Sequence, residues 1–137
     1  GPSRTGEGLV RSVTRTMRKH GADAGEIDFI CAHGTGTVFN DEMEAIAFDR
    51  LALSDKPLNS LKGYFGHTLG AAGVIETAVC MQMIRNGMMI RSMGYRDAGT
   101  SIPLNIMVEN EPKKLRTILK TASGFGGGNA SLMIRDL

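Results

Sequence analysis

The stretch IDFICAHGTGT, residues 27–37, decides the fold. Its first part, Ile27–Ala32, is short, apolar and rich in residues that favour extended backbone, and this pattern predicts a buried strand. The strand passes directly into a loop that holds His33, Gly34 and Gly36. Because glycine allows unusual backbone angles and a close approach of ligands, this loop is a candidate binding site at the end of a strand.

Helical periodicity flanks the strand on both sides. Apolar residues share one face of a helix expected over Glu7–His20, and arginines share the opposite face. These arginines are Arg11, Arg15 and Arg18. A second helix is expected from about Asp41 to Leu53. The nearly all-apolar segment Thr68–Arg85 is expected to be a buried helix, because it is too short and too interrupted to cross a membrane.

Further extended segments complete the pattern. The expected strands are Pro57–Ser60, Leu115–Ala122 and Ala130–Arg135, the last two joined by the turn 123–129. Loops are expected over Leu61–His67 and over most of 86–112, with a short extended piece around Ile102–Leu104. Strands that alternate with helices predict an α/β fold with a mixed sheet of about four to five strands. Helices pack on this sheet, and the chain ends in a β-hairpin.

Composition narrows the class of protein. A chain of 137 residues fits one domain of ordinary size. The formal charge of +2 gives no support for a nucleic-acid-binding protein, which normally has a strong basic excess on one face. No apolar run is long enough for a membrane span. Cys31 and Cys80 both fall in apolar segments, which favours a reducing cytoplasm and core thiols over a disulfide framework.

Two histidines have settings that suit catalysis. His33 and His67 both adjoin glycine clusters at the ends of expected strands, although either alone is more often a hydrogen-bonded loop residue. His67 stands just before a helix, whose positive end disfavours imidazolium. We therefore expect a neutral ring that can donate an N–H to a developing oxyanion or enolate.

The charged residues near these loops have structural interpretations. Glu76 has no neutralising neighbour on its own helix, so a buried Glu76 needs a partner from elsewhere, and Lys62 is the expected one. Asp41 and Glu44 have the spacing of a capping box at a helix start, and an additional hydrogen bond or ion contact near His33 is the alternative for Glu44. We expect no metal site, because no HExxH or CxxC pattern accompanies the histidines.

Three segments, in this order and spacing, resemble the beta-ketoacyl-[acyl-carrier-protein] synthases, the condensing enzymes of fatty-acid and polyketide synthesis with a thiolase-like fold. The segments are AHGTGT (32–37) with Asp41 and Glu44, then Lys62 through GHTLGAAG (66–73) to Glu76, and finally GFGG (124–127) with Asn129. The resemblance covers nearly all of residues 1–137 but only the C-terminal half of such an enzyme. It implies that the nucleophilic cysteine and most of the dimer interface belong to the other half.

The resemblance also implies roles for individual residues. His33 and His67 match the two catalytic histidines, and Lys62 and Glu76 match a supporting ion pair. The other matched positions are Thr35 and Thr37 at the pantetheine arm, the gating Phe125 between the substrate-binding Gly124 and Gly126, and the supporting Asp41, Glu44 and Asn129. Ser123 departs from the family, which usually has a second phenylalanine there, so neither chain-length preference nor gate movement carries over.

For the whole enzyme, the resemblance implies a cytoplasmic homodimer that condenses acyl and malonyl thioesters held by an acyl carrier protein. No cofactor, nucleic acid or membrane is implied. The 137 residues alone are expected to be inactive. Two other interpretations remain open at this point: a non-catalytic partner subunit that resembles a ketosynthase, and a nucleotide-binding α/β domain, although no GxGxxG or Walker pattern is present.

Overall fold

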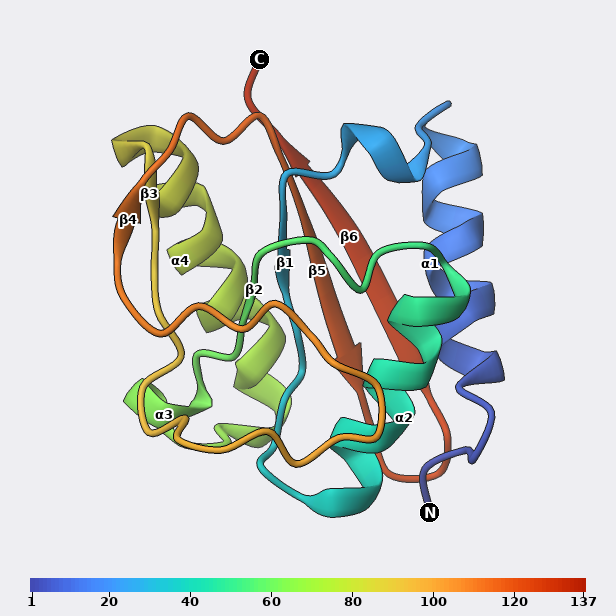
Figure 1. Ribbon diagram of the computed structural model, residues 1–137. Coiled ribbons are helices and arrows are strands. Elements are labelled where there is room, and N and C mark those ends of the chain that lie inside the picture. The colour runs from blue at the N-terminus through green and yellow to red at the C-terminus, as the bar shows by residue number, and fades with distance from the viewer.

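A four-stranded mixed sheet forms the centre of the computed structural model, which describes all of residues 1–137 (Figure 1). Its strands are β1 (Phe29–Cys31), β2 (Leu58–Asn59), β5 (Thr117–Ser123) and β6 (Asn129–Arg135). They lie in the order β2-β1-β5-β6. β1 runs parallel to β2 and β5, and β5 pairs antiparallel with β6. The expected mixed sheet and the terminal hairpin are confirmed.

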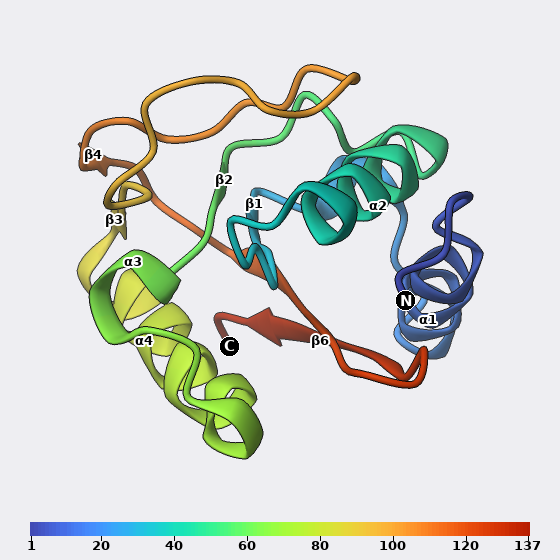
Figure 2. The ribbon, with the colours of Figure 1, turned by 90° about the horizontal axis from the view of Figure 1, so that it is seen from below.

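Helices cover both faces of the sheet (Figure 2). α1 (Glu7–Lys19) and α2 (Val38–Arg50) lie on one face, and α4 (Ala72–Asn86) lies on the other. The remaining helical pieces are the short α3 (Lys62–Phe65) and 3-10 turns at Ala24–Glu26 and Leu69–Ala71. No helix of this structure is both long and apolar enough to cross a membrane.

β1 separates two apolar cores, because successive side chains of a strand point to opposite faces. Ile30 packs with residues of α1 and α2, whereas Phe29 and Cys31 pack against α4. All three side chains are fully buried. The strand is therefore covered on both sides, as its continuous apolar pattern indicates.

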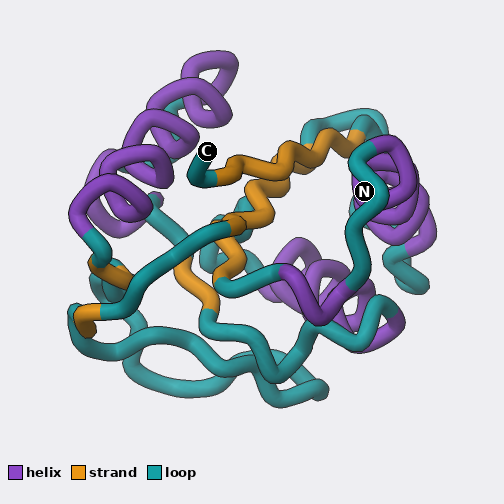
Figure 3. Tube along the Cα trace, turned by 90° about the horizontal axis from the view of Figure 1, so that it is seen from above, coloured by secondary structure: helices purple, strands orange, loops and turns teal.

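The chain between α4 and β5 is mostly irregular, but it contains a small sheet that the sequence analysis did not predict. β3 (Met88–Met89) pairs antiparallel with β4 (Glu111–Pro112). Between them, the chain runs along the free edge of β2, where Leu58 exchanges backbone hydrogen bonds with Asn105 and Met107 (Figure 3). The extended piece expected around residues 102–104 is wrong: the bridge to Leu58 forms at Ile106.

Three other expectations need correction. α2 begins at Val38 instead of Asp41 and ends at Arg50. The expected loop after β2 contains the single helical turn α3. α4 is not a fully buried helix, because it buries only one side. On its other side Val74 is 75% exposed and Met81 is 58% exposed, so an apolar stripe faces solvent.

Candidate functional site

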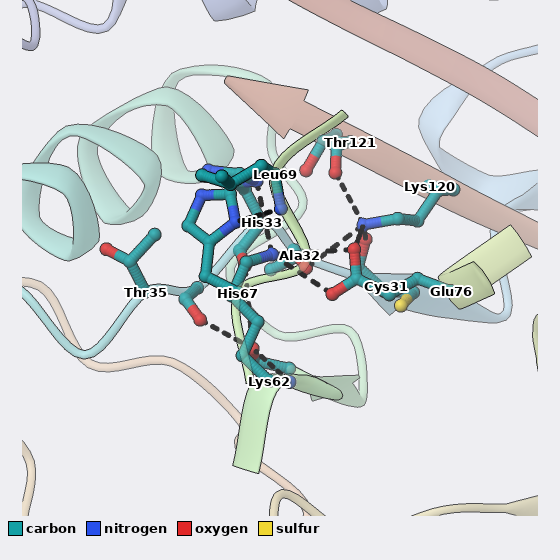
Figure 4. Close-up of polar contacts among 12 residues, drawn as sticks. Cys31, Ala32, His33, Thr35, Lys62, His67, Leu69, Glu76, Lys120 and Thr121 are labelled. Carbon is teal, nitrogen blue, oxygen red and sulfur yellow. Dashed lines mark hydrogen bonds and ion pairs between the residues drawn. The ribbon is translucent and has the colours of Figure 1, made fainter. Parts of the chain in front are cut away.

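The candidate site lies where β1 and β2 end. Because these strands are parallel, their carboxyl ends lie at the same edge of the sheet. His33 follows β1, and Lys62 opens α3 just after β2. Glu76 lies in the second turn of α4 and points toward both (Figure 4). His67, which precedes the 3-10 turn before α4, completes the group.

The loop after β1 is held in a conformation that requires glycine. Gly34 has a φ of +43°, and a Cβ at this position would lie 2.5 Å from the Cβ of Ser60. The Ser60 hydroxyl donates to the Gly34 carbonyl over 2.6 Å. This contact joins the ends of β1 and β2. The sequence analysis missed the role of Ser60, because a lone serine carries no signal of its partner.

Glu44 anchors the same loop from the face of α2. Its carboxylate accepts hydrogen bonds from the backbone N–H of His33 at 2.8 Å and of Gly34 at 2.7 Å. The Asn40 side chain donates to it as well, at 2.9 Å. Burial raises the pKa of Glu44. The capping-box interpretation is wrong, because α2 begins at Val38 and Glu44 lies in its second turn, where it binds the loop instead of the helix start.

The expected ion pair of Lys62 and Glu76 is confirmed. The Lys62 ammonium lies 3.0 Å from Glu76 Oε1, and the two side chains are only 7% and 4% exposed. Lys62 also donates to the His33 carbonyl over 2.6 Å, and its Nζ lies 3.3 Å from His33 Nδ1. The ion pair is therefore attached directly to the first histidine.

These contacts set which nitrogen of each imidazole carries the proton. An ammonium can only donate, so His33 Nδ1 must accept from Lys62 and the proton belongs on Nε2. His67 Nδ1 accepts from the backbone N–H of Leu69 at 3.1 Å, which assigns the same tautomer. The rings meet edge to face, with their centroids 5.1 Å apart. Two neutral Nε2–H donors thus share one site.

We expect the His33 ring to stay neutral well below neutral pH. Burial, followed by the positive charges of Lys62 and Lys120, lowers the pKa of His33 to about 4. A ¹³C NMR titration of labelled histidine, assigned with a His33→Asn variant, checks this expectation in the full-length protein. A His33 signal that titrates near pH 6.5 would contradict it.

Lys120, which the sequence analysis did not single out, joins the site from β5. Its side chain is only 2% exposed, and its ammonium lies 3.2 Å from Glu76 Oε2. A lysine in an otherwise uncharged strand gives the only hint of this position in the sequence. Nothing in the sequence indicates that its partner is Glu76, 44 residues away, because this ion pair depends on β5 lying beside β1.

The remaining predicted residues occupy the rim of the site. Thr35 and Thr37 join through a hydroxyl–hydroxyl contact of 2.7 Å, and Asp41 accepts from the Thr35 backbone N–H. A cleft of about 600 Å³ adjoins this loop, and its lining includes Thr35, Lys62, Tyr95 and Arg96.

The turn between β5 and β6 lies at the same edge of the sheet as the histidine loop (Figure 1). Phe125 is fully exposed at its tip and has no contact with either histidine in this structure. Gly124 donates to the Gly128 carbonyl, and Gly126 has a φ of +86° that suits glycine. Asn129 accepts from the Ser123 hydroxyl over 2.8 Å, which ties the base of the turn.

No metal-binding cluster and no exposed thiol accompany the histidines. No group of three or more histidine, cysteine or acidic side chains has an arrangement that could hold a metal ion. Cys31 and Cys80 are both completely buried. A hydrogen bond with Cys31 and burial raise the pKa of Cys80, so this thiol stays protonated at neutral pH.

Comparison with known proteins identifies the family. The beta-ketoacyl synthase C-terminal domain matches residues 1–96. The 3-oxoacyl-[acyl-carrier-protein] synthase 1 of Escherichia coli is 35% identical over 97% of the chain and 32% of its own length. The ketoacyl synthase alpha subunit of the tetracenomycin polyketide synthase of Streptomyces glaucescens is 31% identical over 94% of the chain and 31% of its own length.

Comparison with solved structures indicates the same family. The ishigamide ketosynthase/chain length factor superposes with a TM-score of 0.94 at 28% identity, covering 100% of this chain and 34% of that one. A beta-ketoacyl synthase from Burkholderia phymatum superposes with a TM-score of 0.91 at 29% identity, covering 99% and 33%. The fold is thus that of the C-terminal part of a thiolase-like ketosynthase. The chain belongs to the beta-ketoacyl synthase family, and it spans about a third of the length of these relatives.

Proposed function

We propose that residues 1–137 form the C-terminal part of a beta-ketoacyl-[acyl-carrier-protein] synthase that condenses an acyl thioester with a malonyl thioester. The observation that carries this proposal is the pair of imidazoles that meet edge to face, His33 after β1 and His67 before the turn Leu69–Ala71, each with Nδ1 occupied as an acceptor. Two such rings, as Nε2–H donors, suit an oxygen that gains negative charge in the transition state.

In the proposed reaction, the malonyl thioester loses carbon dioxide, and the electrons of the broken C–C bond form an enolate. The Nε2–H groups of His33 and His67 donate to the enolate oxygen, which becomes most negative at this step. The enolate carbon then attacks the carbonyl of the acyl-enzyme thioester, and the cysteine thiolate leaves. Neither histidine needs to transfer a proton in this scheme, which fits a His33 pKa of about 4.

The cysteine nucleophile is proposed to come from the N-terminal half of the enzyme. The exposed apolar side of α4, with Val74 and Met81, is a surface that this half or a second subunit would cover. A homodimer is proposed from the resemblance to the family, and a cytoplasmic location from the two free, buried cysteines. Thr35, Thr37 and the adjoining cleft would receive the pantetheine arm, and Phe125 would close over the site.

The direct test is a condensation assay with the full-length protein. It is incubated with an acyl-carrier protein and a malonyl-carrier protein, and mass spectrometry follows carbon dioxide release and the beta-ketoacyl product. A matched reaction without the acyl donor separates decarboxylation from condensation. Absence of both carbon dioxide and product would reject the proposed function, and decarboxylation alone would favour a partner subunit.

Carrier-protein binding gives a separate prediction. Arg11, Arg15 and Arg18 are exposed on α1, and carrier proteins are acidic. Reversing Arg11 and Arg15 to glutamate should weaken carrier affinity about tenfold at low salt, with little effect at high salt. Arg11 already pairs with Glu7, so Arg15 should contribute more.

Binding is measured by titration at two ionic strengths. Arg85→Glu is the matched control, because Arg85 is an exposed arginine near the opposite end of the sheet from the site. An equal loss of affinity in the control, or no loss at low salt in the α1 variant, would reject this surface.

A further inference from the structure

Lys120 is a buried cation that the proposed chemistry does not require. Its ammonium donates to the Thr121 carbonyl at 2.7 Å, lies 3.2 Å from Glu76 Oε2, and contacts the Ala32 and Cys31 carbonyls at 3.3 and 3.5 Å. Burying a charge is costly unless the charge is paired and its donors are satisfied. Lys120 meets both conditions, and every partner lies beside the histidine loop (Figure 4).

Glu76 pairs with two lysines, and the second pair leaves Lys62 protons available for His33. The Lys62 ammonium lies 3.0 Å from Glu76 Oε1 and 3.4 Å from Oε2, and the Lys120 ammonium lies 3.2 Å from Oε2. An ammonium has three protons to donate. Because Lys120 is the nearer cation to Oε2, Lys62 can donate one proton to Oε1 and its other two to the carbonyl and Nδ1 of His33.

Lys120 also acts on the backbone that leads into the site. Ala32 and Cys31, whose carbonyls it contacts, immediately precede His33. Glu44 holds the following amides of His33 and Gly34 from the opposite side. The peptide units before and at His33 are therefore fixed by charged groups from β5 and α2.

We propose that Lys120 is a positioning residue for His33, acting through Glu76 and Lys62 and through the carbonyls of β1. This inference rests on the proposed function, in which His33 is a hydrogen-bond donor to the enolate. It assigns the same site a further buried charge, on a strand distant in sequence from both histidine loops.

The charges around His33 give the proposal a measurable consequence. Lys62 from α3 and the His67 imidazole contact the His33 ring directly. Glu76 from α4 pairs with Lys62 and with Lys120 from β5, and Glu44 from α2 binds the His33 backbone N–H. Removing Lys120 takes one positive charge from this group, so protonation of His33 becomes less costly. The His33 pKa should then rise from about 4, and the neutral donor should be lost at a higher pH.

The test compares Lys120→Met with wild type in the full-length synthase. We expect the ¹³C signal of His33 to titrate about one pH unit higher in Lys120→Met. We expect the rate of malonyl decarboxylation to fall about tenfold or more, because the ring is held less firmly. Leu119→Ala is the matched control: it removes a buried side chain from the neighbouring position of β5 without changing a charge.

Each outcome decides the matter. A His33 titration in Lys120→Met that equals wild type, or equals the shift in Leu119→Ala, would overturn the proposal. If Lys120→Met does not fold, Glu76→Gln is compared with the double variant Glu76→Gln/Lys120→Met. The double variant lacks one negative and one positive charge, so the comparison isolates the loss of the Lys120 charge. A higher His33 pKa in the double variant supports the proposal, and no difference overturns it. The NMR titration needs no turnover. It therefore tests the role of Lys120 even if the decarboxylation assay shows no activity and the proposed function fails.

Discussion

Replacing His67 with alanine in the full-length chain is expected to lower malonyl decarboxylation by about a hundredfold or more, the scale on which one oxyanion donor acts. The physical reason is the fixed tautomer: the Leu69 N–H occupies His67 Nδ1 and leaves Nε2–H free for the enolate oxygen. His33→Ala should cause a loss of the same order, because Lys62 assigns the same tautomer to that ring.

The measurement is carbon dioxide release from malonyl-carrier protein under saturating conditions. His20→Ala is the matched control, since His20 is the third histidine and lies exposed at the C-terminal end of α1. We expect the control to retain wild-type activity. Near-normal decarboxylation in His67→Ala would defeat the assignment of the site.

The isolated 137 residues are expected to be unable to condense thioesters at all. Condensation needs a thiolate activated by a positive neighbour or a helix N-terminus. Cys31 is completely buried in β1, and Cys80 is buried in the middle of α4 with a raised pKa. Neither thiol can reach a carrier-bound acyl group without opening the core.

Intact-mass spectrometry of the purified segment, mixed with an acyl thioester and malonyl-carrier protein, tests this prediction. The expected mass is that of the unmodified chain, with no beta-ketoacyl product. The full-length protein in the same buffer is the positive control. Acylation of Cys31 or Cys80 together with product formation would contradict the prediction.

The fold was predictable wherever the sequence pattern is local and long. The apolar run of β1, the two-faced pattern of α1 and the paired strands around the 123–129 turn all correspond to observed elements. β3 and β4, of two residues each, were missed because the segment 86–112 that contains them has no regular apolar pattern. The exposed side of α4 was missed because an apolar stripe alone does not show whether anything covers it.

The site was predictable only in part, for a different physical reason. The Lys62–Glu76 pair followed from the cost of burying an unpaired carboxylate near a single free lysine. Glu44 was assigned to a helix cap because its spacing from Asp41 fits one, whereas its actual partners are the amides of the His33 loop. Lys120 was missed because its partners are brought together by strand pairing, which sequence spacing does not reveal.

The pairing of β5 with β1 affects how the chain folds while it is being synthesised. Lys120 and Cys31 are 89 residues apart in the chain, yet their contact holds the backbone just before His33. During synthesis the first histidine loop emerges long before the strand that completes it. Closing so large a loop is entropically costly and slow. The nascent chain must therefore keep β1, one of its most apolar segments, from pairing wrongly until β5 has left the ribosome.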